Sequence, residues 1–138
     1  MKPQNKGKPV VLFCDGASRG NPGPGAFGYV ILKDDDILFQ EGKCIGTVTN
    51  NIAEYQGLLH GLKKCLELGL DHVTVKSDSQ LMVRQLNGEY KVKAPQLVPL
   101  FFEAQGLLKK FHRVEVVHVR REENTLADAM CNEALDNA

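Results

Sequence analysis

The hydrophobic period of this chain changes near residue 52, and this change constrains the fold more than any other feature of the sequence. Before it, short apolar or alternating segments at 10–14, around Val30 and at 37–45 have the pattern of β-strands. After it, apolar side chains recur at the 3.6-residue period of a helix, and Gly69 is the expected stop. The residues on that apolar helix face are Tyr55, Leu58, Leu59, Leu62 and Leu66.

The first three strands are separated by short connections. Residues 16–25 are dense in Gly, Pro and Asn, which predicts a turn, and the aspartates at 34–36 predict the next turn. Strands with connections this short are expected to form an antiparallel meander.

The second half of the chain predicts two more strands among helices. The segments are a strand at 73–75, a short helix at 81–86, a helix with Pro95 in its first turn and Pro99 still near its start that runs to about Phe111, a strand at 114–119 and a helix at 125–135. A crossover through helices makes the last two strands parallel. The expected fold class is therefore α/β, with a five-stranded mixed sheet (three antiparallel strands, then two parallel) and flanking helices.

Size and composition indicate one ordinary globular domain. The chain has 138 residues, 43% of them hydrophobic and 25% charged. We expect residues 1–9 to be a flexible tail and 10–138 to be the domain. The sequence shows neither a secretory signal nor an apolar run of about 20 residues, so we expect a cytoplasmic protein that does not enter the membrane. No two cysteines are spaced as Cys-x-x-Cys, which argues against structural zinc, and Cys14 and Cys65 are expected in the core.

The formal net charge is zero, but the charges are unevenly distributed. Residues 76–121 hold nine Lys or Arg and four acids. This excess fits either a local phosphate-binding face or a solvated surface of mixed charge.

Four acidic residues lie where active sites gather in open α/β sheets, at strand ends and helix starts. Asp15 is expected to end the first strand, Glu54 to lie in the first turn of the long helix, Asp78 to follow the fourth strand and Asp128 to begin the last helix. Carboxylates that converge would repel one another unless divalent cations neutralise them, and all-oxygen ligands suit Mg²⁺ or Mn²⁺.

Each acid also has a purely structural interpretation. Asn51-x-x-Glu54 and Thr125-x-x-Asp128 resemble capping boxes, Asp78-Ser79 could cap a helix, and Asp15-Gly16 could form a turn. The match of residues 23–28 to G-x-G-x-x-G is rejected as a nucleotide site, because the residues that follow have a strand pattern rather than a helical one.

Four segments, in order along nearly the whole chain, resemble the motifs of the ribonuclease H type 1 family, in its short form without a basic insertion. They are FCDGASRGNPGPG at 13–25, TNNIAE at 49–54, SDSQ at 77–80 and NTLAD at 124–128. The resemblance implies a ribonuclease H-like fold. It also implies a metal-dependent endoribonuclease that hydrolyses the RNA strand of RNA–DNA hybrids with little sequence specificity, leaving 5′-phosphate and 3′-hydroxyl ends.

The resemblance also assigns roles to particular residues. Asp15, Glu54, Asp78 and Asp128 would be the catalytic carboxylates that bind two Mg²⁺, with Mn²⁺ as a substitute. The positions where the family contacts the hybrid are Gly16, Ser18, Asn21, Asn50, Asn51 and Gln80. From the residues alone, the two asparagines could equally be loop and cap residues, and Gln80 a solvated helix residue.

The chain departs from the family in two places. Many members carry a His on a loop before the last carboxylate, whereas residues 120–123 contain none, and His118 is interpreted as a strand residue. We expect Arg120 or Arg121 to take over a supporting role. The chain also lacks Trp and the long basic insertion that many members have between the middle helices. The only basic residues in the short segment 88–94 at that place are Lys91 and Lys93, so we expect weaker hybrid binding.

Two rival functions remain at this point. The chain could be a catalytically weak module that binds hybrids or double-stranded RNA, or another metal nuclease of the same fold, such as a resolvase. The presence of all four carboxylates favours the enzyme, and the complete first motif with the Asn50-Asn51 pair favours the ribonuclease. Double-stranded RNA stays open as an additional substrate, and we expect a monomer.

Overall fold

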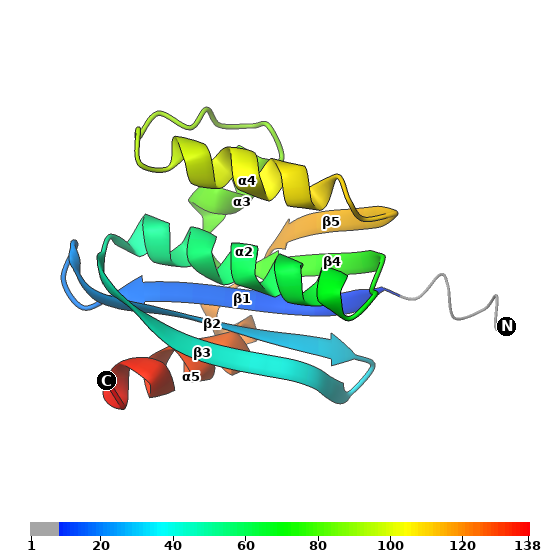
Figure 1. The fold of residues 1–138 in the computed structure, drawn as a ribbon, viewed down its shortest axis with the longest axis horizontal. Helices are drawn as coiled ribbons and strands as arrows, with labels where there is room; N and C mark the ends of the chain where they lie inside the picture. The colour runs from blue at the N-terminus through cyan, green and yellow to red at the C-terminus, as the bar shows by residue number, and fades with distance from the viewer. Residues whose placement is uncertain (1–8) are drawn as a thin grey trace, which may run out of the picture.

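A computed structural model describes residues 9–138, which form one mixed sheet flanked by helices (Figure 1). The strand order is β3-β2-β1-β4-β5. The strands are β1 (Val10–Ser18), β2 (Gly23–Lys33), β3 (Asp36–Val48), β4 (His72–Ser77) and β5 (Arg113–His118). The first three pair antiparallel, while β4 pairs parallel with β1 and β5 parallel with β4. The predicted five-stranded mixed sheet is confirmed.

Helices cover both faces of the sheet. They are α2 (Asn50–Glu67), α3 (Gln80–Leu86), α4 (Val98–Leu108) and α5 (Thr125–Asp136), with a 3₁₀ turn η1 (Arg121–Glu123) before α5. Helix α2 packs on β1 and β2 with α4 beside it, and α5 lies across β1, β2 and β3 (Figure 1). Successive residues of β2 point to opposite faces, since Phe27 contacts α2 whereas Gly28 contacts α5.

The main core lies between the sheet and α2, α3 and α4. Its largest fully buried side chains include Tyr29, Tyr55, Phe27 and Leu12. A smaller cluster of Ala26, Cys131 and Leu135 lies under α5. Cys14 and Cys65 are buried as predicted, and all four cysteines are free thiols.

The structure corrects the bounds of one predicted turn and of one predicted helix. The turn predicted at 16–25 is much shorter, because β1 continues to Ser18 and β2 already begins at Gly23. The helix predicted to start around Pro95 begins at Val98, so Pro99 and not Pro95 lies in its first turn, and it ends at Leu108. The predicted N-terminal tail lies outside the described residues, apart from residue 9.

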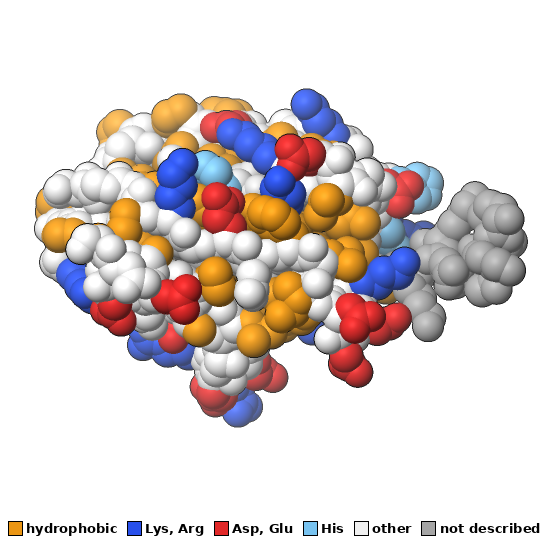
Figure 2. Space-filling model, turned by 60° about the horizontal axis from the view of Figure 1, so that its bottom comes forward, with side chains coloured by type: hydrophobic (Ala, Val, Ile, Leu, Met, Phe, Trp, Pro, Cys, Tyr) orange, Lys and Arg blue, Asp and Glu red, His pale blue; other side chains and the backbone are white. Residues whose placement is uncertain are grey.

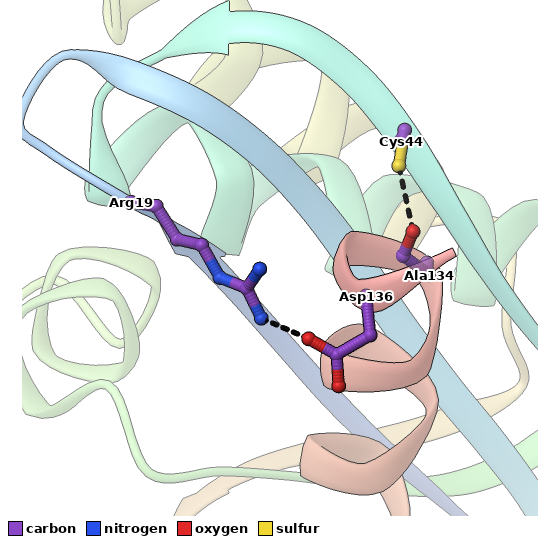
Figure 3. Close-up of polar contacts among 4 residues, drawn as sticks. All are labelled: Arg19, Cys44, Ala134 and Asp136. Atoms are coloured by element: carbon purple, nitrogen blue, oxygen red, sulfur yellow. Dashed lines mark hydrogen bonds and ion pairs between the residues drawn. The ribbon is translucent and has the colours of Figure 1, made fainter. Parts of the chain in front are cut away.

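The C-terminal end of α5 is attached to the sheet by two polar contacts (Figure 3). Arg19, in the β1–β2 turn, forms an ion pair with Asp136. The thiol of Cys44 in β3 donates a hydrogen bond to the Ala134 carbonyl, with 3.0 Å between sulfur and oxygen. These contacts fix the end of α5 that lies away from Asp128.

The surface drawn in Figure 2 carries basic and acidic side chains interspersed with hydrophobic ones. On this face the charges therefore form a mixed surface rather than a single-sign patch. Among the described residues, no helix combines the length and apolar character needed to cross a bilayer.

Candidate active site

Asp15 lies inside β1 and not at its end, contrary to the prediction. It is paired with Gly28 of β2, and the strand runs three residues further. The interpretation of Asp15-Gly16 as a turn is therefore wrong. The Asp15 side chain is buried, with 6% of the residue exposed.

Glu54 is brought to Asp15 by close contact between two backbones. A β-carbon added to Gly16 would lie 2.2 Å from the carbonyl carbon of Ala53, and one added to Gly57 would lie 2.5 Å from the Asp15 carbonyl oxygen. Glycine at both positions lets α2 lie directly on β1. Glu54 lies between Ala53 and Gly57 in the sequence, so these two backbone contacts hold its side chain close to β1.

The start of α2 differs from the capping-box interpretation. Thr49 is the N-cap, and its hydroxyl accepts a hydrogen bond from the Ile52 N–H at 3.3 Å. Glu54 therefore lies beyond the first turn, where a cap function is unavailable to it. The predicted first-turn position and the Asn51–Glu54 capping box are both wrong.

Asp78 and Asp128 are also not caps. The N-cap of α3 is Ser79, whose hydroxyl accepts from the Met82 N–H at 3.3 Å, so Asp78 stands free of this role between β4 and α3. The N-cap of α5 is Asn124, which places Asp128 in the first turn and makes the Thr125–Asp128 capping box wrong. The capping alternative therefore explains none of the acids at helix starts.

The structure brings the predicted carboxylates together. One oxygen each from Asp15, Glu54 and Asp78 lie within 4.8 Å of one another. Asp128 lines the same pocket, which has a volume of about 580 Å³. Four acids that are up to 113 positions apart in the sequence thus share one site, as the sequence predicted.

Burial and neighbouring charges raise the pKa values of two of the acids, Asp15 and Glu54. Burial raises the pKa of the Asp15 carboxyl, and the charge of Asp78 and a hydrogen bond with the Asp128 side chain raise it further. Burial also raises the pKa of Glu54, with added effect from the charges of Asp15 and Asp78. A hydrogen bond from the Gly16 N–H and the charge of Arg121 act in the opposite direction on Glu54.

These properties fit a divalent cation. Glu54 Oε1 is buried without a hydrogen-bond partner, although a buried carboxylate oxygen normally has one. A hard cation would supply that partner and compensate both the burial and the mutual repulsion that raise the pKa values of Asp15 and Glu54. The ligand set consists of oxygen atoms alone, which suits Mg²⁺ or Mn²⁺ better than zinc.

Three of the predicted substrate-contact residues bind one another beside this pocket. Asn50 Oδ1 accepts hydrogen bonds from the N–H of Ser18 at 2.8 Å and from its hydroxyl at 3.1 Å. The Asn50 N–H donates to Asn21 Oδ1 at 3.0 Å. This network fixes the β1–β2 turn against the start of α2, and it uses the carbonyl end of the Asn50 amide.

Of the other predicted contact residues, two line the pocket and one does not. Gly16 and Asn51 line the pocket with Asn50, whereas Gln80 is exposed at the first position of α3 and is absent from the pocket wall. The contact role of each of these residues stays a prediction.

The last wall of the pocket comes from the segment after β5. Arg120 and Arg121 line it, as do His118 and Asn132. His118 is a strand residue, as predicted, but the parallel register sets it opposite Ser77, next to Asp78. Sequence reasoning missed its place in the pocket, which the pairing of the last two strands could have indicated. Asn132 was also missed, although it stands one helical turn after Asp128.

Comparison with known proteins gives this geometry a context. The model of the family described as "Reverse transcriptase-like" matches residues 13–134. Ribonuclease HI of Halobacterium salinarum is 42% identical over 135 residues, covering 97% of this chain and 68% of that protein. The chain belongs to the ribonuclease HI family.

Solved structures of ribonuclease HI proteins share the fold. RNase H1 from Halobacterium salinarum has a TM-score of 0.90 at 42% identity, covering 94% of this chain and 98% of that chain. The N-terminal RNase H domain of a Mycobacterium tuberculosis protein also gives 0.90, at 42% identity and with 94% and 95% covered. LC11-RNase H1, solved in complex with an RNA/DNA hybrid, gives 0.87 at 37% identity, with 93% and 97% covered.

The chain spans about a third of the length of some curated relatives that it matches. The "Bifunctional protein" of Mycobacterium tuberculosis is 44% identical over 131 residues, which make up 94% of this chain but 36% of that protein.

Proposed function

We propose that this chain is a ribonuclease H that hydrolyses the RNA strand of RNA–DNA hybrids by a two-metal mechanism, leaving 5′-phosphate and 3′-hydroxyl ends. The observation that carries the proposal is the convergence of Asp15, Glu54 and Asp78, with Asp128 in the same pocket, in a member of the ribonuclease HI family. A relative at 37% identity has been solved with an RNA/DNA hybrid, which supports the substrate class.

The four carboxylates would hold Mg²⁺, or Mn²⁺ in its place. Bound there, the ions supply Lewis-acid activation of water and neutralise charge on the scissile phosphate and the leaving oxygen. The protein's own contribution is to position ligands that are already crowded and partly dehydrated. Glu54 and Asp15 are fixed by backbone contact between α2 and β1, so little rearrangement is needed to bind a cation.

Substrate positioning would come from the turn after β1 and the start of α2. The side-chain oxygen of Asn50 accepts hydrogen bonds from Ser18. The N–H groups of the same side-chain amide are suited to donate to phosphate or 2′-hydroxyl oxygens of the substrate. Contacts of this kind read the sugar and the backbone rather than the bases, so we propose little sequence specificity. The short segment after β5 provides Arg121 near Glu54 in place of a loop histidine.

The proposal is tested with short duplexes that carry one end-labelled strand. RNA–DNA, RNA–RNA and DNA–DNA are compared in Mg²⁺, in Mn²⁺ and in chelator, with Asp78→Asn as the inactive control. Metal-dependent cutting confined to the RNA of the hybrid is expected, with product ends read by phosphatase and ligase sensitivity. Cutting of RNA–RNA as well would widen the substrate class. If the protein binds the hybrid but does not cut it, the proposed enzymatic function is wrong and the chain is a binding module.

A further inference from the structure

Asn124 lies directly before α5, four residues ahead of Asp128. The residue is fully buried, at 0% exposure. It occupies the N-cap position of α5, yet its side chain makes no capping hydrogen bond to the helix. Asparagine at an N-cap normally accepts from the N–H groups of the first turn, so its side chain here serves another purpose.

The side chain is bound to the first strand. Asn124 Nδ2 donates to the Cys14 carbonyl oxygen at 3.0 Å, a contact between residues 110 positions apart. The Cys14 carbonyl and the Asp15 N–H belong to one planar peptide unit. Asn124 therefore holds the peptide plane from which Asp15 extends.

The backbone of Asn124 is bound to the other carboxylate residue. Its carbonyl accepts the N–H of Asp128 at 3.1 Å, which is the first hydrogen bond of α5. Two hydrogen bonds through one residue thus connect the main chain at Asp15 with the main chain at Asp128.

This connection lies at the end of α5 that faces the site. Asp15 and Asp128 line one pocket, and the spacing between β1 and the start of α5 determines how far apart their side chains lie. The opposite end of α5 is attached independently, through Asp136 and Ala134 (Figure 3). Nearer the site, α5 lies closely against β2 at Gly28, and Asn124 adds the hydrogen bond to β1.

We infer that Asn124 is a positioning residue of the carboxylate site, which sets the spacing between Asp15 and Asp128 by linking their backbones. The inference rests on the proposed function for its kinetic consequence, but its consequence for cation binding can be measured separately. Mutating residues that hold metal ligands in position typically changes metal affinity or activity by about 10–100-fold.

The test compares Asn124→Ala with Leu135→Ala. Leu135 is buried in the same helix but lies at its far end and outside the pocket wall, so its truncation loosens α5 without touching the link. Denaturant unfolding establishes that both variants are folded. Mn²⁺ affinity is then measured by calorimetry, and kcat and KM are measured on an RNA–DNA hybrid.

We expect Asn124→Ala to weaken Mn²⁺ binding about tenfold or more and to lower kcat similarly, with KM for the hybrid nearly unchanged. Leu135→Ala should keep both values within about twofold of the parent protein, however much stability it loses. Equal effects of the two variants would reduce Asn124 to a structural residue and overturn the inference.

Two further arms keep the outcomes distinct. If Asn124→Ala does not fold, Asn124→Ser replaces it, because serine suits an N-cap but is too short to reach the Cys14 carbonyl. The same loss of Mn²⁺ affinity is expected. A parent protein that binds Mn²⁺ but cuts no hybrid would overturn the proposed function alone, while a parent that binds no Mn²⁺ would overturn this inference as well.

Discussion

The backbone of Gly57 in α2 lies so close to Asp15 in β1 that a β-carbon at position 57 would be 2.5 Å from the Asp15 carbonyl oxygen. A contact this short cannot accommodate any side chain, and the obstacle is main chain rather than a movable side chain. The separation of Glu54 from Asp15 is therefore set by two helix–strand contacts, at Gly57 and at Gly16, and not by the carboxylates themselves.

Gly57→Ala should separate α2 from β1. We expect a loss of about 1–3 kcal/mol in the free energy of unfolding, typical of overpacking, together with weaker cation binding. Gly106→Ala is the matched control, since it changes the same residue type in α4 where no atom lies within 4 Å of the new β-carbon. That control should gain roughly 0.5–1 kcal/mol from helix propensity. Denaturant titration checks both, and equal stability of the two variants would contradict the packing argument.

Asp78→Asn should abolish cleavage while leaving the fold intact, because it removes a ligand charge without changing volume. We expect kcat to fall by about a hundredfold or more, since cation catalysis contributes several kcal/mol and each 1.4 kcal/mol is a factor of ten. Asp71→Asn, at an exposed position just before β4 and outside the pocket wall, is the control that should cleave normally. Activity of Asp78→Asn within a few-fold of the parent would count decisively against the assignment.

In chelator, the stability of the protein should decrease as the pH rises from about 4, the ordinary pKa of aspartate, to neutral pH. The pKa of Asp15 is raised on folding, so in this range the folded protein holds a proton that the unfolded chain releases, and raising the pH favours unfolding. Excess Mg²⁺ should reverse the trend, because the cation binds the deprotonated carboxylates.

The pH effect is measured by thermal unfolding at pH 5 and pH 7.5, with and without Mg²⁺. Asp15→Asn provides the control, since it removes one of the two carboxyls whose pKa values are raised and should make the decline in chelator smaller. A decline of the same size in the variant would assign the pH dependence to other groups.

Arg121 and Arg120 should differ in their effect on turnover. The charge of Arg121 acts on Glu54, whereas Arg120 lies 3.9 Å from Glu122 with its side chain 79% exposed. We expect Arg121→Ala to slow turnover several-fold more than it weakens Mg²⁺ binding, Arg121→Lys to retain most activity, and Arg120→Ala to have the smaller effect. Rates measured across a Mg²⁺ titration separate the two quantities. A shift in Mg²⁺ dependence with unchanged maximal turnover would contradict this role.

Much of the fold could be predicted because its signals are local. The change from strand periods to a helical period near residue 52 identified the order of elements, and the crossover between β4 and β5 required a parallel pair. Boundaries were less predictable. Residues 16–18 contain a glycine and a serine that suit a turn, yet pairing with residues 25–27 of β2 keeps them in β1. Strand pairing depends on a partner that the local sequence does not show.

The same distinction applies to the site. The sequence by itself determined which acids are the candidate site residues, because the motifs and the expected strand ends and helix starts are local features. These acids are Asp15, Glu54, Asp78 and Asp128. Only the tertiary structure decided that none of these acids is a helix cap and that His118 lines the pocket. It also decided that the Asn124 side chain donates to the Cys14 carbonyl and does not cap α5. Caps and strand positions follow from neighbours in sequence. Which buried donor meets which carbonyl follows from how helices and strands pack, and that is fixed only when the whole chain has folded.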